Sequence, residues 1–131
     1  MRYLFDSSAI FRAIRENKVE VLTGNFTLEL ARYELGNIVW KDYALQAKVS
    51  EQQAKMMAHT IKKTLTILDV QDLAGNEEEV LETAIQLRIT FYDASYVYFA
   101  KEKELKLITE DLRLIKRITA KMKVSTLDSV I

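Results

Sequence analysis

Four acidic residues, Asp6, Glu34, Asp93 and Asp111, lie beside apolar segments that are expected to build the core. Asp6 and Asp111 each follow a short strand-like apolar run, and Asp93 opens an apolar-aromatic stretch. Carboxylates seldom lie in such places unless a partner compensates their charge. A shared divalent cation is one such partner, because hard cations such as Mg²⁺ prefer oxygen ligands. The four acids are therefore the candidate metal-binding and catalytic residues.

Each acid also has an explanation that involves no chemistry. The three aspartates are candidate helix caps, since an aspartate side chain accepts backbone N–H groups and complements the helix dipole. Glu34 lies in the middle of a predicted helix, on the same face as Leu30 and Ile38. A buried glutamate without a partner is costly. The structural alternative for Glu34 is a salt bridge to Arg32 or Lys41.

Size and composition predict one globular domain over residues 1–131, because 49% of the side chains are apolar. The chain has no cysteine, which excludes disulfides, thiolate zinc sites and iron–sulfur clusters. Asp6 interrupts the first apolar run before a signal peptide can form. No run approaches the roughly 18 apolar residues that a membrane span needs. We therefore expect a soluble, cytoplasmic protein with no membrane partner.

The charges balance overall but are unevenly distributed. Nineteen lysines and arginines offset nineteen acidic residues, so the formal net charge is zero. Residues 101–123 nevertheless carry eight basic side chains against four acidic ones. A basic segment that flanks an acidic cluster suits a phosphate-rich substrate approaching a metal, whereas a solvated helix face is the simpler interpretation.

The hydrophobic periodicity predicts strands that alternate with helices. Expected strands cover 2–5, 19–22, 65–70, 105–109 and 124–126, and expected helices cover 8–16, 27–47, 51–63, 76–88, 94–104 and 112–120. A turn is expected at 23–25, and Asn76 with Glu79 resembles a capping box. This alternation predicts an α/β fold, with a mainly parallel sheet covered by helices on both faces. In such sheets the site lies beyond the carboxyl ends of the strands, where Asp6 and Asp111 fall.

Four segments in order now resemble the PIN domain family, in particular the VapC-type toxins of toxin–antitoxin pairs. They are Leu4-Phe5-Asp6-Ser7-Ser8-Ala9, Glu34-Leu35-Gly36-Asn37, Tyr92-Asp93-Ala94-Ser95-Tyr96 and Leu107-Ile108-Thr109-Glu110-Asp111. Their order and spacing agree over essentially the whole chain. Two departures are the missing proline before the long helix and the additional carboxylate of Glu110.

The resemblance implies a three-layer α/β/α PIN-like fold with four to five strands. It also implies a metal-dependent endoribonuclease in which Asp6, Glu34, Asp93 and Asp111 gather around Mg²⁺ or Mn²⁺. Asp6 and Asp93 are the expected direct ligands, whereas Asp111 and Glu34 are expected to act through water or to activate it. Water is then the attacking group, and it leaves a 5′-phosphate and a 3′-hydroxyl.

By the same resemblance, further residues surround this cluster and further chains bind the protein. Ser7 and Thr109 are expected to orient carboxylates or contact phosphate, Asn37 to support Glu34, and Glu110 to lie in the second shell or near the substrate. The expected partners are an RNA substrate, a small antitoxin protein and a second copy of the chain.

Two other functional classes compete with this hypothesis. One is a PIN module that binds RNA or protein without catalysis, or that processes RNA; the presence of all four acids argues against the inactive form. The other is a different doubly wound protein with clustered aspartates. A phospho-receiver needs an acidic pair after its first strand, and a haloacid-dehalogenase-like phosphatase needs Asp-x-Asp, but Asp6 is followed by Ser7 and Ser8.

The remaining polar and aromatic residues have structural interpretations. His59 is the only histidine, which excludes a histidine-pair ribonuclease mechanism, and we expect it at the surface. Aromatic residues at 91, 92, 96 and 98 are candidates for stacking on bases, but packing is the favoured role. Trp40 and the stripe of apolar residues at 56, 57, 61 and 65 are candidates for the core or for an interface.

Overall fold

The structure is a computed structural model that describes residues 2–131. Its centre is a sheet of five short strands in the order β3-β2-β1-β4-β5, and every neighbouring pair is parallel. The strands are β1 (Tyr3–Phe5), β2 (Phe26–Leu28), β3 (Asp69–Gln71), β4 (Lys106–Ile108) and β5 (Val124–Ser125). The predicted parallel sheet is therefore confirmed.

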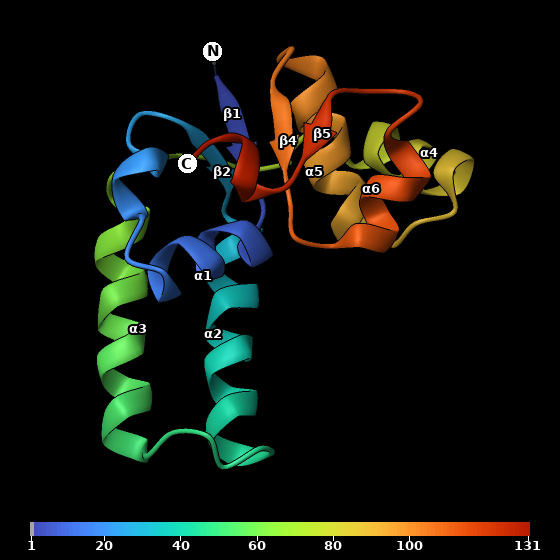
Figure 1. The fold of residues 1–131 in the computed structure, drawn as a ribbon. Helices are drawn as coiled ribbons and strands as arrows, with labels where there is room; N and C mark the ends of the chain where they lie inside the picture. Colours follow the sequence, from blue (N-terminus) through green and yellow to red (C-terminus); the bar gives the residue numbers. More distant parts are fainter. Residues whose placement is uncertain (1) are drawn as a thin grey trace.

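Helices cover both faces of this sheet (Figure 1). The helices of the first half are α1 (Ser7–Arg15), α2 (Leu30–Ala44) and α3 (Glu51–Leu65). Those of the second half are α4 (Glu77–Leu87), α5 (Phe91–Glu102) and α6 (Leu112–Ile118), and the 3₁₀ turns are η1 (Val19–Leu22) and η2 (Leu127–Ser129). The first three helices lie on one face and the last three on the other, which confirms the predicted three-layer α/β/α fold.

Alternation along the central strands builds a separate core on each face. Phe5 and Ile108 are buried together with residues of α1, α2 and α3. Leu4 and Leu107, one residue earlier in each strand, are buried with residues of α5 and α6. Successive side chains of a strand point to opposite faces, so β1 and β4 supply both cores. The central strands are thereby fixed in register, and the groups at their carboxyl ends take fixed positions.

Three predicted boundaries in the first half are wrong. Residues 19–22, expected as the second strand, form the turn η1. The second strand is Phe26–Leu28, of which Thr27 and Leu28 were expected to begin a helix. The deciding contact is tertiary, because the buried Thr27 hydroxyl donates to the carbonyl of Phe5 at 2.7 Å. Similarly, α3 continues to Leu65 because this residue is buried in the core, so β3 begins only at Asp69.

The caps of two helices in the second half differ from expectation. Helix α5 begins at Phe91, with Thr90 as the cap, so Asp93 lies in the first turn instead of capping the helix. Asn76 precedes α4 but makes no side-chain cap, and the predicted capping box is absent there. Its side-chain oxygen instead accepts a hydrogen bond from the Tyr98 hydroxyl at 3.2 Å. Within residues 2–131, no helix combines the length and the apolar character that crossing a membrane requires.

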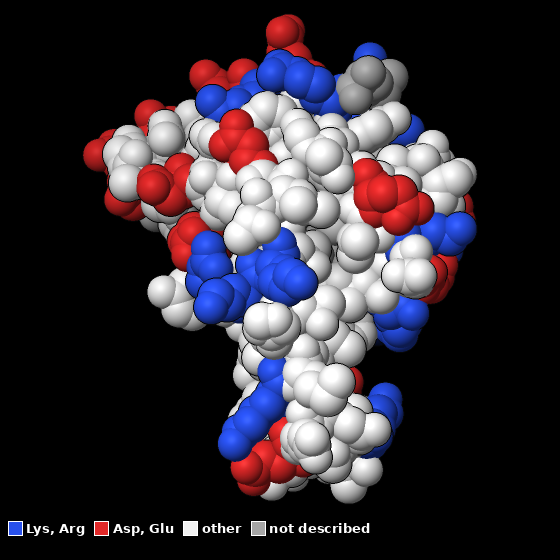
Figure 2. All heavy atoms as spheres, turned by 90° about the vertical axis from the view of Figure 1, so that its left-hand side faces the viewer, with Lys and Arg blue, Asp and Glu red and all other residues white. Residues whose placement is uncertain are grey.

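Helices α2 and α3 extend beyond the sheet as an antiparallel pair (Figure 1). The face that carries α3 shows basic and acidic side chains interspersed, with no continuous field of one sign (Figure 2). A polyanion needs a positive surface to bind. This face therefore has no electrostatic preference for a nucleic acid.

Candidate active site

The candidate site lies where the direction of strand succession reverses in the sheet. Strand β1 has β2 on one side and β4 on the other, so the connections after β1 and β4 leave in opposite directions. A crevice at the carboxyl ends of such strands is the usual ligand site of open α/β sheets. Asp6 follows β1, and its backbone N–H donates to the Ile108 carbonyl at 3.1 Å. Asp111 follows β4 three residues after Ile108.

Asp6 is buried and serves as a helix cap as well as a candidate ligand. Its Oδ1 accepts hydrogen bonds from the Ala9 N–H at 3.0 Å and from the Ser8 hydroxyl at 2.7 Å. The side chain thus caps α1, as the structural alternative predicted. These bonds use one carboxylate oxygen and fix the orientation of the group.

Burial raises the pKa of the Asp6 carboxyl from its ordinary value of 3.8 to about 6. The neighbouring charge of Glu34 raises this pKa further, whereas hydrogen bonds from Thr109, Ser8 and Ala9 lower it. The fold therefore holds a carboxylate whose charge is poorly compensated by the protein. Such perturbed groups are concentrated at functional sites.

Glu34 reaches the site from the second turn of α2. It is half-buried, and its Oε1 accepts a hydrogen bond of 2.7 Å from the Tyr96 hydroxyl of α5. Burial and the charge of Glu34 both raise the pKa of Tyr96, so this tyrosine remains a protonated donor. The salt bridge expected as the alternative for Glu34 is absent among residues 2–131, because Arg32 pairs with Glu29. Asn37 is exposed, and no hydrogen bond between it and Glu34 occurs in that range.

Asp93 and Asp111 complete the group of acids. Asp93 is half-buried in the first turn of α5, and the pKa of its carboxyl is raised by burial and by the charges of Asp111 and Glu34. Asp111 is exposed and caps α6, since its Oδ1 accepts the N–H groups of Arg113 and Leu114 at 3.0 and 3.1 Å. Capping is thus confirmed for Asp6 and Asp111 and wrong for Asp93.

The four acids act on one another electrostatically and have no basic partner. The charge of Glu34 perturbs both Asp6 and Asp93, and that of Asp111 perturbs Asp93. Across residues 2–131, none of the four takes part in an ion pair with lysine, arginine or histidine. Like charges held together without a counter-charge favour a bound cation or a retained proton.

The donor chemistry fits a hard divalent cation, although the side chains do not converge as coordination requires. The group contains carboxylates and hydroxyls, which are the oxygen ligands that Mg²⁺ and Mn²⁺ accept. In the described part of the chain, no set of three acidic or histidine side chains lies close enough to enclose an ion. The acids thus lie near enough to perturb one another beyond the carboxyl ends of β1 and β4, but they do not converge on a single point.

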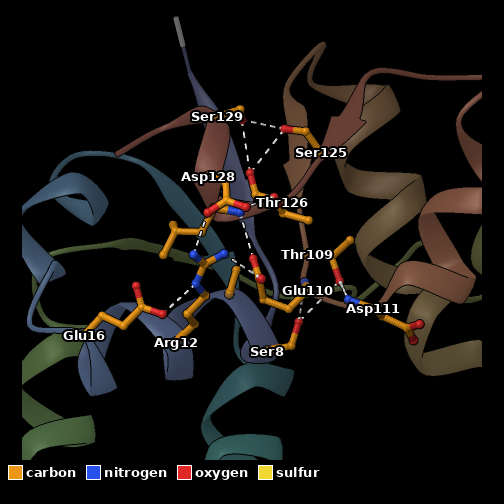
Figure 3. Close-up of polar contacts among 12 residues, drawn as sticks. Ser8, Arg12, Glu16, Thr109, Glu110, Asp111, Ser125, Thr126, Asp128 and Ser129 are labelled. Atoms are coloured by element: carbon orange, nitrogen blue, oxygen red, sulfur yellow. Dashed lines mark hydrogen bonds and ion pairs between the residues drawn. The ribbon is translucent and has the colours of Figure 1, made fainter.

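The residues expected around the acids differ in how far they reach the site. Thr109 is buried, and its Oγ1 accepts the Asp111 N–H at 3.1 Å. Ser7 contributes a hydrogen bond with Tyr96 that lowers the pKa of this tyrosine, against the larger effects that raise it. The Glu110 carboxylate points toward Arg12 of α1, whose Nη1 donates to its Oε1 at 2.8 Å (Figure 3).

Three residues of the site escaped the interpretation of the sequence. The Ser8 hydroxyl links Asp6 to Glu110, because the Glu110 N–H donates to Ser8 Oγ at 2.8 Å. Ser8 Oγ also lies 3.3 Å from Thr109 Oγ1. Tyr96 was assigned to packing and is indeed buried, but it also holds Glu34. Thr90 caps the helix that carries Asp93. Only Thr90 had a local signal, since a threonine three residues before an acid is a typical cap.

A surface depression lies beside Glu34. Its volume is about 490 Å³, and it is lined by Leu30, Tyr33, Glu34, Asn37 and Tyr92. Tyr33 and Tyr92 are 71% and 61% exposed, which leaves both aromatic rings free to pack on a ligand. Tyr92 is thus the one tyrosine of α5 that remains a candidate for stacking on a base. His59 is exposed, as expected, and it does not line this depression. It lines a different cavity, between α2 and α3.

The sheet order and the four acids at its switch point define a PIN-like domain, and comparisons with known proteins place it more closely. The chain is 31% identical to Exonuclease VapC9 of Pyrobaculum aerophilum over 129 residues, which are 97% of this chain and 93% of the relative. It is 32% identical to Ribonuclease VapC3 of the same organism over 94 residues, or 72% and 71% of the two chains. No family model matches the sequence.

Solved structures agree with this placement. The crystal structure of PAE2754 from Pyrobaculum aerophilum superposes with a TM-score of 0.81 at 26% identity, covering 98% of this chain and 91% of that one. VapBC2 from Rickettsia felis, bound to a DNA fragment from its promoter, gives a TM-score of 0.67 at 18% identity over 96% and 98% of the chains. This chain therefore belongs to the VapC family of PIN-domain proteins.

Proposed function

We propose that this protein is a ribonuclease that hydrolyses RNA phosphodiester bonds with Mg²⁺ or Mn²⁺ at Asp6, Glu34, Asp93 and Asp111. The observation that carries the proposal is a group of mutually perturbing acids at the switch point of the sheet, which form no ion pair with a basic side chain among residues 2–131. Membership of a family whose relatives are named exonuclease and ribonuclease supports it. A bound divalent cation supplies a water of lowered pKa and offsets charge on the phosphate.

The residues of the chain have distinct tasks in this proposal. Asp6 and Asp93 are the metal ligands, because their carboxyls combine burial with raised pKa values that a cation would lower. Asp111 is exposed, so its carboxylate can accept a hydrogen bond from a water molecule or from a hydroxyl group of the substrate. Glu34 accepts a proton from the attacking water, and the Tyr96 hydroxyl holds its Oε1 in place. The Ser8 hydroxyl orients the Asp6 carboxylate by donating to its Oδ1, and Thr109 Oγ1 accepts the backbone N–H of Asp111.

Basic residues of α6 are suited to bind the RNA backbone beside this group. Arg113 and Arg117 are one helical turn apart with Lys116 between them, and all three are exposed. They begin two residues after Asp111, so they flank the acids without neutralising them. Phosphate contacts of this kind bind without regard to sequence, whereas Tyr92 offers a stacking surface for a base.

Partner chains are part of the proposal. A small antitoxin protein is the expected partner, because the Rickettsia felis neighbour is a VapBC assembly. Exposed apolar residues on α2, among them Tyr33 and Trp40, supply a surface that a partner chain can cover. We propose that this surface serves the antitoxin or a second copy of the chain, and light scattering of the purified protein would measure the oligomeric state.

The decisive experiment compares RNA cleavage by the wild type and by Asp93→Asn, with Mn²⁺, with Mg²⁺ and with a chelator. The expected result is cleavage by the wild type with either metal, none with the chelator, and none by the variant. Asp72→Asn, which alters an exposed aspartate in a loop away from the group, is the matched control. Equal cleavage by the wild type and Asp93→Asn would refute the assignment.

A second substrate is needed to determine whether the protein cuts within the RNA or removes nucleotides from an end. Loss of a linear RNA does not distinguish internal cutting from removal of nucleotides at an end, and the two relatives carry different names in this respect. A circular RNA of the same sequence has no end. We expect the protein to linearise the circle as an endonuclease and to leave 5′-phosphates. A circle that stays intact while its linear form is degraded would assign exonuclease activity.

A non-catalytic module that binds or helps to process RNA is the alternative. It predicts RNA binding without metal dependence, and binding that survives Asp93→Asn. Filter binding in chelator distinguishes the two, because a polyacidic site without metal should repel RNA phosphates.

A further inference from the structure

Arg12 of α1 binds three carboxylates that come from three parts of the chain. Its Nε lies 2.8 Å from Oε2 of Glu16, its Nη1 2.8 Å from Oε1 of Glu110, and its Nη2 2.6 Å from Oδ1 of Asp128. Figure 3 shows this fan of contacts beside the residues that lead to Asp111. Glu16 belongs to the end of α1, Asp128 to η2, and Glu110 to the loop after β4.

The three partners are unequal because they differ in exposure. The side chains of Arg12 and Glu110 are 18% and 24% exposed, whereas those of Glu16 and Asp128 are 38% and 72% exposed. Water and salt screen exposed pairs most strongly. The pair with Glu110 is therefore the least screened of the three, and it is the one that joins α1 to the candidate site.

Glu110 is fixed at three points. Besides its bond to Arg12, its Oε2 accepts the Leu127 N–H at 2.7 Å, and its own N–H donates to the Ser8 Oγ at 2.8 Å. Both carboxylate oxygens and the backbone N–H are thus used. The residue therefore has little freedom to rotate.

Asp111, by contrast, makes hydrogen bonds within the described residues only to partners that lie within three positions of it in the sequence. It is exposed, its Oδ1 caps α6, and its N–H donates to Thr109. Its position relative to Asp6 therefore depends on the neighbouring residue, Glu110, and through it on Arg12. Displacement of a catalytic group by about 1 Å can cost on the order of a hundredfold in rate.

We propose that Arg12 is a positioning residue for the site, acting through Glu110 to hold Asp111 beside the other acids. This inference rests on the proposed function. The inference gives a role to Glu110, whose additional carboxylate departs from the pattern of the PIN family. The proposed catalytic mechanism does not use this carboxylate. The simpler alternative is that Arg12 and Glu110 only hold the C-terminal turn η2 against α1.

Two isosteric substitutions around the same guanidinium separate these possibilities. Glu110→Gln removes the charge of the partner in the site loop, while its amide oxygen can still accept the Leu127 N–H. Glu16→Gln removes the charge of a partner within α1 and leaves the loop untouched. The measurements are RNA cleavage, Mn²⁺ affinity by calorimetry without RNA, and hydrogen exchange of the amides of 109–111 in metal-free protein.

Positioning predicts that Glu110→Gln lowers kcat about tenfold at nearly constant KM and weakens Mn²⁺ binding about tenfold, as changes next to metal ligands commonly do. Amide exchange in 109–111 should accelerate, and Glu16→Gln should match the wild type in all three measurements. Arg12→Gln should reproduce the effect of Glu110→Gln, and combining the two should add nothing, because both remove one interaction.

Wild-type kcat and Mn²⁺ affinity in Glu110→Gln would overturn the inference, as would equal losses in Glu110→Gln and Glu16→Gln. Failure of the proposed function looks different. A wild type that binds Mn²⁺ but cleaves no RNA refutes the ribonuclease, while the Mn²⁺ affinities of the variants still decide the role of Arg12. A wild type that binds no Mn²⁺ overturns both.

Discussion

Replacing Asp6 by asparagine should abolish cleavage and, in metal-free protein, make the fold more stable. Asp6 is 6% exposed, and the pKa of its carboxyl is raised to about 6 mainly by burial. Asparagine caps helices as well as aspartate does, and its oxygen can accept the same bonds from Ala9 and Ser8. The substitution therefore removes the buried charge while it keeps the hydrogen bonds that involve Oδ1.

The size of the effect follows from the shift in pKa. A carboxyl with a pKa of 3.8 in the unfolded chain and about 6 in the fold binds its proton more tightly when folded. The free energy of unfolding therefore falls as the pH rises from about 4 to about 6 and is constant above that range. At about 1.4 kcal/mol per pKa unit, the cost at pH 7 is about 3 kcal/mol. At pH 4.5 it is about 1 kcal/mol by the same linkage.

Urea denaturation in chelator at several pH values measures this cost. The new amide N–H₂ of asparagine needs an acceptor in a buried place, which offsets about 1 kcal/mol at every pH. The stability difference between Asp6→Asn and the wild type should still grow by about 2 kcal/mol from pH 4.5 to pH 7. Added Mn²⁺ should reduce this difference, because it stabilises only the protein that binds it.

The control is Asp111→Asn, which removes another capping aspartate of the same group from an exposed position. This variant should gain less stability than Asp6→Asn, because an exposed carboxylate keeps most of its hydration in the folded protein. A stability difference for Asp6→Asn that does not change with pH would refute the reasoning. Such a result would mean that the buried carboxylate is fully compensated by its hydrogen bonds and does not need a cation.

The other predictions concern single side chains. Asp93→Asn should reduce cleavage at least a hundredfold with an unchanged fold by circular dichroism, and wild-type rates would exclude it as a ligand. Tyr96→Phe should lower kcat several-fold while the melting temperature changes little, since it removes only the hydroxyl that binds Glu34. Phe5→Ala should cost about 3–5 kcal/mol in urea denaturation, because the ring is fully buried. Arg113→Ala should weaken RNA binding equally for all sequences and flatten its dependence on salt, as gel-shift titrations would measure.

The sequence predicted the α/β class and most helices because their apolar periodicity is strong and local. Strand β2 was missed, although its residues have the composition of a strand, because the helical pattern of the following segment was extended back to Thr27. What makes this residue part of the sheet is its hydrogen bond to Phe5, 22 positions earlier. Propensity is a weak guide wherever tertiary contacts decide.

In the candidate site too, the sequence predicted what has a local signal and missed what depends on tertiary contacts. The four acids were found because charged residues beside apolar runs are conspicuous in any sequence. The hydroxyls of Ser8 and Tyr96 were not assigned to the site, because serine and tyrosine are common and their partners lie far along the chain. Tyr96 meets Glu34 across 62 positions, and Ser8 meets Glu110 across 102. Only the fold shows that these groups are paired.

The central place of β1 in the sheet has a consequence for the timing of activity during synthesis. Strand β1 is made first, yet its partner β4 lies about a hundred positions later in the chain. The acids therefore cannot assemble on a growing chain until nearly all of it has left the ribosome. Contacts of such long range also fold slowly. The group of acids is therefore complete only when synthesis of the chain is nearly finished, and a shorter nascent chain lacks the β1–β4 pairing that positions Asp6 beside the end of β4.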